Sequence, residues 1–196
     1  MSPAAPSNNR RDSVAPQAGD ALLIIDVQRD FLPGGALAVR QGERVVPVLN
    51  RYVDEFQTLG LPIVATRDWH PPNHCSFVPQ GGRWPVHCVA GTPGAAFADD
   101  LRLPADVHVI SKATEPDREQ FSDFPGSDLG AWLRSRHVRR LFIGGLATDY
   151  CVLANVRDAR HHGFQVVLLT EAIAAVDDRD GAAALEEMQR LGAQLL

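Results

Sequence analysis

The sequence predicts an α/β protein with three layers: a doubly wound, mostly parallel six-stranded sheet between two layers of helices. Short runs of consecutive apolar residues recur along the chain, and such runs are typical of strands buried on both faces of a parallel sheet. Longer segments between these runs carry apolar residues at helical spacing. Strands that alternate with helices in this way form right-handed βαβ units, which place helices on both faces of the sheet.

The predicted strands are short and mainly apolar. The first has the most continuous apolar run and carries a carboxylate, Asp26, near its end. In chain order, the predicted strands are residues 21–27, 61–66, 107–111, 141–147, 165–170 and 193–196. No repeat or linker divides them, so we expect one domain over residues 20–196.

Helical spacing is clearest between residues 43 and 59. There Val45, Leu49 and Phe56 lie on one apolar face, and Gly60 ends the helix. The other predicted helices are residues 127–136, 149–162 and about 179–191.

Charge and hydropathy exclude two classes of partner. The 196-residue chain has a formal net charge of −5, which provides no basic field for nucleic acid or for an anionic membrane surface. No apolar run approaches the roughly 20 residues that span a bilayer. Residues 1–19 are rich in Pro, Ala, Ser and Asn and lack the apolar core of a secretory signal, so we expect a flexible tail there.

The cysteine content indicates a reducing compartment. Cys75, Cys88 and Cys151 form a sparse, odd-numbered set, which argues against a disulfide framework and for a cytoplasmic protein. Cys75 and Cys88 could pair, but nothing in the sequence demands it. Patches for self-association cannot be read from one chain, so a homo-oligomer stays open.

Five functional side chains follow the ends of four predicted strands. Asp26 closes the first strand, Asp68 and His70 follow the second, Lys112 closes the third and Cys151 follows the fourth. In doubly wound folds, ligands bind at the carboxyl ends of the strands, near a topological switch point. The convergence of these residues on one edge of the sheet predicts a functional site.

Cys151 is a candidate nucleophile. It follows an apolar strand and a glycine-permitted turn at residues 144–145, and it lies in the first turn of a helix, where the helix dipole favours the thiolate. Asp26 would be its base, with a pKa raised by burial, and Lys112 would stabilise nearby negative charge. Each has a plainer explanation: a packed core cysteine, a carboxylate that accepts backbone amides, and a solvated lysine.

The long stretch 69–104 contains candidate metal ligands. It has no sustained periodicity, and loops of this length in a compact domain are usually functional. Asp68, His70, His74 and His87 lie in or beside it, and an aspartate with two imidazoles can bind Zn²⁺ or Fe²⁺ with positions left open. Cys88 is a further conceivable ligand. Hydrogen bonds within the loop would also explain an Asp-x-His pair.

Aromatic side chains could line a pocket for a flat ring, although ordinary core packing would explain each of them as well. These candidates are Phe31, Trp69, Trp84, Phe121 and Tyr150.

Together these residues form a pattern that resembles a known family. The motifs, in chain order, are Asp26-Val27-Gln28 with Asp30-Phe31, Thr66-Arg67-Asp68-Trp69-His70-Pro71, Trp84-Pro85-Val86-His87-Cys88, Lys112, and Gly145-Leu146-Ala147-Thr148-Asp149-Tyr150-Cys151-Val152. They resemble the nicotinamidase/pyrazinamidase branch of the isochorismatase-like cysteine hydrolases. The resemblance covers nearly everything from Ala21 onward, and the metal motifs point to this branch within the wider superfamily.

The resemblance implies roles for individual residues. It implies the isochorismatase-like hydrolase fold, with a catalytic triad of Asp26, Lys112 and Cys151. The implied metal ligands are Asp68, His70 and His87, and His74 lies near the place where some relatives supply a fourth. A cis peptide bond is implied between Leu146 and Ala147, with the amides of Ala147 and Cys151 forming an oxyanion hole.

The resemblance also implies an activity. The family hydrolyses nicotinamide to nicotinate and ammonia through a cysteine thioester, a step of NAD salvage, and its members also cleave pyrazinamide. It uses one divalent metal ion, for which we expect zinc, with iron or manganese as alternatives. The substrate ring is expected among Phe31, Trp84, Phe121 and Tyr150; Phe121 stands where a tyrosine is frequent in the family.

Two other functions fit the same pattern. One is a different amide or ureido hydrolase of the superfamily, which would act on a carbamoyl group without a metal. The other is a catalytically silent binding protein with this fold, against which the intact Asp26, Lys112 and Cys151 set argues. An isochorismatase is less expected, because that branch generally lacks the cysteine.

Overall fold

The computed structural model describes residues 14–196. Most of the predicted tail, residues 1–13, lies outside the described residues, and the first described residue, Val14, is buried against the core. No helix in residues 14–196 is long and apolar enough to cross a membrane.

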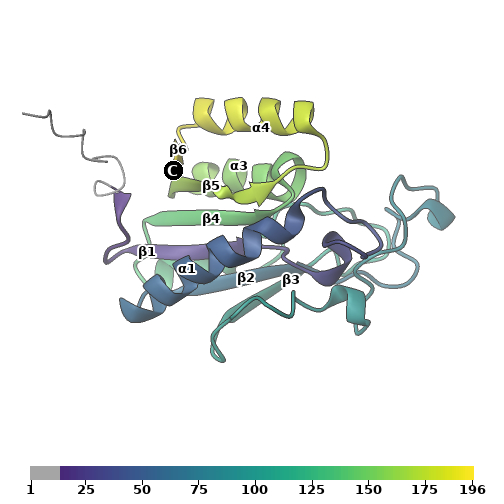
Figure 1. Ribbon diagram of the computed structural model, residues 1–196, viewed down its shortest axis with the longest axis horizontal. Helices are drawn as coiled ribbons and strands as arrows, with labels where there is room; N and C mark the ends of the chain where they lie inside the picture. The colour runs from purple at the N-terminus through teal and green to yellow at the C-terminus, as the bar shows by residue number, and fades with distance from the viewer. Residues whose placement is uncertain (1–13) are drawn as a thin grey trace, which may run out of the picture.

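Six parallel strands within residues 14–196 form a single sheet, which confirms the predicted α/β class (Figure 1). The strands are β1 (Asp20–Ile25), β2 (Ile63–Asp68), β3 (His108–Lys112), β4 (Arg140–Leu146), β5 (Gln165–Ala174) and β6 (Gln194–Leu195). Their order across the sheet is β3-β2-β1-β4-β5-β6. The order reverses between β1 and β4, so the topological switch point lies there.

In the part of the chain that the structure describes, four α-helices cover the two faces of the sheet. They are α1 (Val45–Thr58), α2 (Leu129–Ser135), α3 (Leu153–His161) and α4 (Asp178–Arg190). Helix α1 crosses one face, in front of the sheet in Figure 1, and the other three pack against the opposite face.

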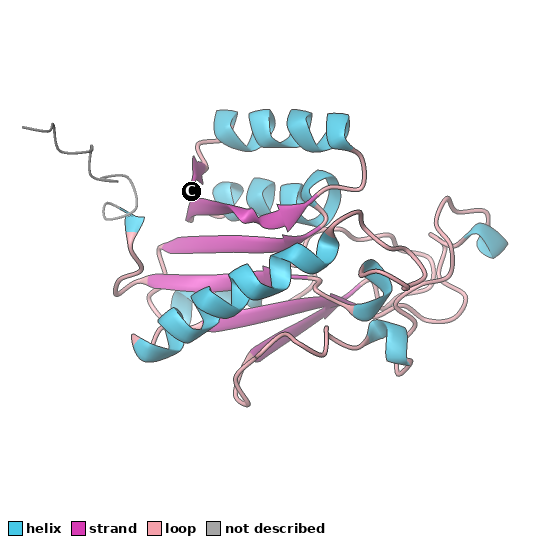
Figure 2. Ribbon diagram, in the orientation of Figure 1, coloured by secondary structure: helices cyan, strands magenta, loops and turns pink. Residues whose placement is uncertain are grey.

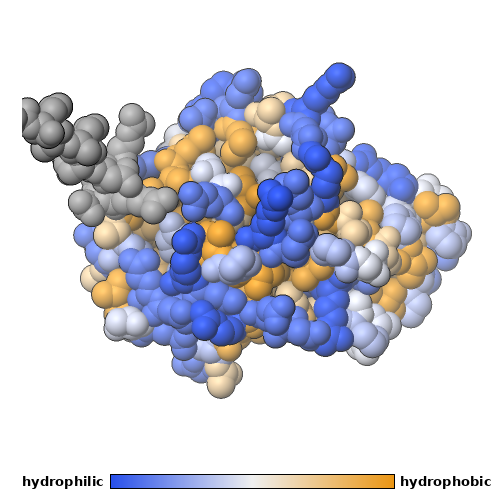
Figure 3. All heavy atoms as spheres, in the orientation of Figure 1, coloured by the Kyte–Doolittle hydropathy of each residue, from blue (hydrophilic) through white to orange (hydrophobic). Residues whose placement is uncertain are grey.

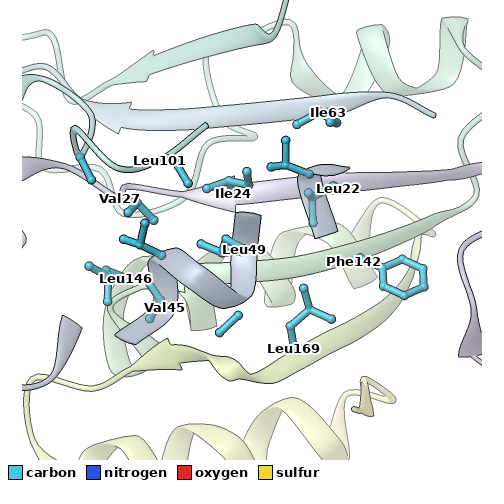
Figure 4. Close-up of a cluster of buried hydrophobic side chains, with 14 of the residues drawn as sticks. Leu22, Ile24, Val27, Val45, Leu49, Ile63, Leu101, Phe142, Leu146 and Leu169 are labelled. Atoms are coloured by element: carbon cyan, nitrogen blue, oxygen red, sulfur yellow. The ribbon is translucent and has the colours of Figure 1, made fainter. Parts of the chain in front are cut away.

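The middle of β1 shows why a continuous apolar run predicts a central strand. Leu22 and Ile24 point into the core under α1, whereas Leu23 and Ile25 point into the core under the other helices, and all four are fully buried. Figure 4 shows the first of these cores, where side chains of α1 and of the sheet interdigitate. The outer surface on the same side is mainly hydrophilic, with apolar residues in smaller groups (Figure 3).

Loops and short turns make up the edge of the molecule beyond the carboxyl ends of the strands (Figure 2). The turns are the 3₁₀ helices Arg29–Phe31, Gly42–Arg44, Val78–Gln80 and Pro93–Ala95, and the π-helical turn Thr148–Val152. The stretch between β2 and β3 contains two of these turns and otherwise irregular backbone, as its sequence predicts.

Two expected element boundaries differ from the structure by more than two residues. The helix expected over residues 149–162 is divided into the π-helical turn and α3. The strand expected to end at residue 170 continues to Ala174, because β5 resumes its pairing with β4 after a register shift, at Gly145↔Ile173.

The glycines at residues 144–145 do not form the turn that the sequence suggests. They lie inside β4, which continues to Leu146. Gly145 has a φ of 132°, and a Cβ built on it would lie 2.0 Å from the carbonyl oxygen of Ile25. A side chain at this position would therefore push β1 and β4 apart at the switch point.

The Gly145→Ala variant should lose about 3 kcal/mol or more of its free energy of unfolding, because both the close approach of β1 and the positive φ exclude a side chain. Gly163→Ala is the matched control: its φ is 86° but no atom lies within 4 Å of the built Cβ, so only about 1 kcal/mol should be lost. Urea unfolding of the two variants measures both losses. Equal losses would show that the contact with Ile25 is unimportant.

Candidate active site

Strands β1 to β4 bring four of the predicted residues together at the edge of the sheet where the strands end. Asp26 directly follows β1, Asp68 and Lys112 end β2 and β3, and Cys151 lies in the π-helical turn after β4. All four are buried. They surround the switch point between β1 and β4, where doubly wound folds bind their ligands.

Lys112 lies at the centre of this group, and it is the only lysine in the sequence. Its fully buried Nζ forms an ion pair and hydrogen bond with Asp26 Oδ2, and it lies 3.1 Å from Asp68 Oδ1 and 3.5 Å from Asp123 Oδ1. Burial alone would lower the pKa of Lys112, but the three carboxylates outweigh burial and raise it well above its ordinary value. The lysine is therefore a permanent buried cation and not a solvated surface charge.

Asp26 is held by side chains and not by the backbone amides that its position also allows. Its Oδ1 accepts a 2.7 Å hydrogen bond from Thr66 Oγ1, and its Oδ2 is paired with Lys112. Burial raises the pKa of Asp26, although Lys112 opposes this shift. A buried carboxylate with a raised pKa is suited to accept and return a proton.

Cys151 lies beside this carboxylate. Its Sγ and carboxylate oxygens of Asp26 and Asp68 all lie within 4.8 Å of one another. Burial and the two carboxylates raise the pKa of the Cys151 thiol well above its ordinary value, although Lys112 lowers it. The expected lowering of this pKa by a helix terminus is thus wrong, because burial outweighs it. The resting sulfur is a thiol that needs a base.

Two buried residues of this network were not predicted from the sequence: Asp123 and Asn155. Asp123 faces Lys112, and its Oδ2 accepts a 2.7 Å hydrogen bond from Asn155 Nδ2. Burial raises the pKa of Asp123 to about 7, against the effect of Lys112. Asp123 lies in a loop and Asn155 within α3, so neither shares the position at a strand end that marks the other residues.

Asp68, His70 and His87 form a group that could hold a divalent metal. One ligand atom from each lies within 4.8 Å of the others, and all three residues are buried. His70 Nδ1 contacts the carbonyl of Ala113 at 3.2 Å, and His87 Nδ1 contacts that of Pro85 at 2.7 Å. These contacts fix Nδ1 as the donor and leave each Nε2 lone pair free for a metal.

Unsatisfied polar atoms support the metal assignment. His70 Nε2 is buried and has no hydrogen-bond partner, and Asp68 Oδ1 is buried with no hydrogen bond, although it forms an ion pair with Lys112 Nζ at 3.1 Å. Burial lowers the pKa of His87, which keeps its imidazole neutral, as metal ligation requires. Burial alone would raise the pKa of Asp68, but neighbouring groups, chiefly the positively charged Lys112, outweigh burial and lower it, so Asp68 is a carboxylate. The donor set fits a divalent ion such as zinc.

His74 is adjacent to this group but is already engaged. Its ring centroid lies 4.3 Å from that of His70, yet its Nδ1 contacts Ser76 Oγ at 2.7 Å and its Nε2 contacts the carbonyl of Arg118 at 3.0 Å. Both ring nitrogens are therefore used within the protein. The structure does not bring His74 into the ligand group.

Neighbouring polar side chains fix the ligands in place. The Gln28 side chain accepts from the Asp68 amide at 2.8 Å and donates to the Asp68 carbonyl at 2.8 Å. Asp30 Oδ2 accepts a 2.7 Å hydrogen bond from the amide of Cys88, next to His87. Gln28 and Asp30 belong to the first motif, so the sequence marked them without showing this role. Burial raises the pKa of the Cys88 thiol, and Cys88 lies outside the ligand group.

A pocket opens onto both groups of residues. Asp68, His70, His87 and Cys151 line it together with Ala147. The four aromatic residues expected to bind the substrate ring also line it: Phe31, Trp84, Phe121 and Tyr150. Trp69 does not line the pocket and instead stacks on the Arg67 guanidinium.

Aromatic side chains form one wall of the pocket. The Trp84 and Tyr150 rings meet edge to face, 5.2 Å apart, and Phe121 lies 5.7 Å from Tyr150. The peptide bond between Leu146 and Ala147 is cis, as the family resemblance implies. The pocket thus combines an aromatic wall with a thiol and metal-ligand atoms, and the buried carboxylate of Asp26 lies beside the thiol.

Comparisons with known proteins agree with this geometry. The family described as the isochorismatase domain matches residues 20–196. Nicotinamidase of Escherichia coli strain K12 is 37% identical over 198 residues, covering 89% of this chain and 93% of that protein.

Two solved structures are similar along most of the chain. Pyrazinamidase of Pyrococcus horikoshii in complex with zinc is 50% identical, with a TM-score of 0.88, and the match covers 91% of this chain and 98% of that chain. A protein from L. infantum in complex with nicotinate is 41% identical, with a TM-score of 0.86, and the match covers 91% of this chain and 92% of that chain.

Proposed function

The chain belongs to the isochorismatase family, and from this premise we propose that it is a nicotinamidase, an amidohydrolase that converts nicotinamide to nicotinate and ammonia. The observation that carries the proposal is the shared pocket. Cys151, the metal-ligand group and the aromatic wall line it, and the buried Asp26, paired with Lys112, lies beside the Cys151 sulfur. The similarity to nicotinamidases, and to a structure that holds nicotinate, supports this substrate.

We propose that Asp68, His70 and His87 hold one zinc ion. The buried, unpartnered His70 Nε2 supports this assignment, as does the zinc in the similar pyrazinamidase structure. When bound, the ion supplies a Lewis acid that accepts the lone pair of a pyridine nitrogen. Iron and manganese are the alternatives for the same donor set.

In the proposed pose the substrate ring lies among Phe31, Trp84 and Phe121, with Tyr150 at the same wall. All four line the pocket, together with Cys151. Phe121 has no hydroxyl group, so it contributes an apolar face only. The carboxamide would then point towards Cys151.

The first half of the reaction forms a thioester. Asp26 accepts the proton of the Cys151 thiol, and the thiolate attacks the carboxamide carbon. The resulting oxyanion is stabilised by the amides of Ala147 and Cys151, our proposed oxyanion hole, at about 2.7–4 kcal/mol for each donor. The C–N bond then breaks, and the Asp26 carboxyl gives its proton to the departing ammonia.

The second half of the reaction releases nicotinate. Asp26, again a carboxylate, accepts a proton from a water molecule that attacks the thioester carbon. The C–S bond breaks, and the Cys151 sulfur leaves with the proton that Asp26 returns. Lys112 keeps its positive charge throughout and offsets the negative charge that moves between Asp26 and Cys151.

The value of kcat/KM should fall as the pH is lowered, because Asp26 must be ionised to accept the thiol proton. Burial raises the pKa of Asp26 above the ordinary 3.8, so the midpoint of the acid limb should lie above pH 3.8. A pH profile measured with nicotinamide, with circular dichroism to show that the protein stays folded, checks this. A flat profile down to pH 4 in folded protein would contradict the role of Asp26.

Release of ammonia from nicotinamide, measured by a coupled assay with and without a chelator, tests the function. We expect turnover that the chelator removes and that added Zn²⁺ restores. Turnover of an N-carbamoyl substrate in preference to nicotinamide, unaffected by the chelator, would instead indicate the ureido hydrolase. An intact protein with no turnover of either substrate would indicate a silent binding protein.

The site of action in the cell stays a proposal. The sparse cysteine set supports the cytoplasm, and the net charge of −5 supports a small-molecule partner over nucleic acid or anionic membrane. Self-association into a homo-oligomer is a matter for measurement of the solution mass.

A further inference from the structure

Asp123 and Asn155 form a buried pair for which the reaction above has no role. Both are fully buried. Asn155 Nδ2 donates to Asp123 Oδ2 at 2.7 Å, and the Asp123 amide donates to Asn155 Oδ1 at 3.1 Å. Burying a carboxylate is costly unless it is paired, so this position needs an explanation.

The pair connects the lysine of the site to the nucleophile. Asp123 Oδ1 lies 3.5 Å from Lys112 Nζ and has no hydrogen-bond partner of its own. The second hydrogen atom of Asn155 Nδ2 is directed to the carbonyl oxygen of Cys151, at 3.0 Å. A continuous polar path therefore leads from Lys112 through Asp123 and Asn155 to the turn that carries Cys151.

Neither member of the pair is among the residues that line the pocket. Any effect on the reaction must therefore pass through Lys112 or Cys151. An ammonium group has three hydrogen atoms to donate, and Lys112 faces three carboxylates. Without Asp123 it would be held by Asp26 and Asp68 alone, which are the proposed base and a proposed metal ligand.

We propose that Asp123 and Asn155 are positioning residues for this hydrolysis. Asp123 fixes the Lys112 ammonium, and Asn155 ties the Asp123 carboxylate to the backbone of Cys151. The lysine and the nucleophile thereby keep one relative position during turnover. The kinetic part of this inference rests on the proposed nicotinamidase function.

Steady-state kinetics with the zinc-loaded enzyme test the pair. We expect Asp123→Asn to lower kcat by about 10–100-fold and to leave KM for nicotinamide within about twofold, since positioning neighbours of a site typically have effects of this size. Asn155→Ala should lower kcat about tenfold. The double variant should be no slower than Asp123→Asn, because both residues act along one path.

Ser122→Ala is the matched control. Ser122 lies next to Asp123, is buried, and accepts a hydrogen bond from the Phe124 amide at 3.3 Å without contact to Lys112. The Ser122→Ala variant should have the same kcat as the unchanged enzyme. The proposal is overturned if Asp123→Asn behaves like this control, if it changes KM and not kcat, or if the two losses in the double variant multiply.

Nuclear magnetic resonance gives a readout that does not depend on turnover. Because Lys112 is the only lysine, enzyme labelled with nitrogen-15 at the lysine Nζ should give one ammonium signal. Asn155→Ala should move this signal in the unchanged enzyme but not in the Asp123→Asn background, because the effect passes through Asp123. A shift of equal size in both backgrounds would overturn the proposal. If the unchanged enzyme releases no ammonia from nicotinamide, the proposed function fails while this test still decides the positioning.

Discussion

The Cys151→Ala variant should release no measurable ammonia from nicotinamide, with kcat reduced by a factor on the order of 10⁵ or more. The proposed reaction needs a covalent bond to sulfur, and the other polar groups of the pocket cannot replace that bond. Nicotinamide should still bind, because the aromatic wall and the metal-ligand group are unchanged. Coupled detection of ammonia and calorimetric binding measure the two effects.

Cys75→Ser is the control for this experiment. Cys75 is partly exposed and lies outside the residues that line the pocket, so its replacement should leave kcat unchanged. Substantial turnover by the Cys151→Ala variant would exclude the thioester mechanism. Loss of activity in both variants would point to a general sensitivity of the thiols and not to a nucleophile.

The His70→Ala/His87→Ala variant should purify without stoichiometric metal and without measurable turnover. Two of the three proposed ligands are lost, and Asp68 alone, already paired with Lys112, cannot hold a divalent ion. Elemental analysis by mass spectrometry reads the metal content independently of activity. Full metal content in this variant would overturn the ligand assignment.

His74→Ala separates ligation from packing. Both ring nitrogens of His74 have partners within the protein, so its removal should leave the metal content near that of the unchanged enzyme. It should instead cost about 1–3 kcal/mol of the free energy of unfolding, because Ser76 and the Arg118 carbonyl lose a buried partner. Loss of metal in this variant would make His74 a fourth ligand after all.

Local patterns in the sequence were sufficient to predict the sheet. Residues 22–25 are apolar at consecutive positions because β1 is covered on both faces, and this is visible without any tertiary information. The site residues at strand ends were predictable for a related reason: parallel strands end at one edge, so Asp26, Lys112 and Cys151 had to lie near one another.

Other features depend on contacts that no local pattern records. Asp123 resembles any solvated loop carboxylate, and Asn155 resembles any polar helix residue, until the fold buries them against each other. The predicted lowering of the Cys151 pKa was wrong for the same reason. The sequence shows where the helix starts, but not the burial of the thiol or the carboxylates beside it. The lysine content could have indicated the role of Lys112. A single lysine contributes little to solubility, so its position at a strand end favours a functional role.

The single lysine also determines how the folded protein reacts with reagents that modify amino groups. The side chain of Lys112 has no exposed surface, so no ε-amino group is available to acylating, glycating or cross-linking reagents while the fold is intact. Positive charge elsewhere in the sequence is carried by arginine, whose guanidinium group does not react with acylating reagents at neutral pH. Acylation of Lys112 therefore requires the sheet to open, and the rate of acylation reports the rate at which the protein unfolds.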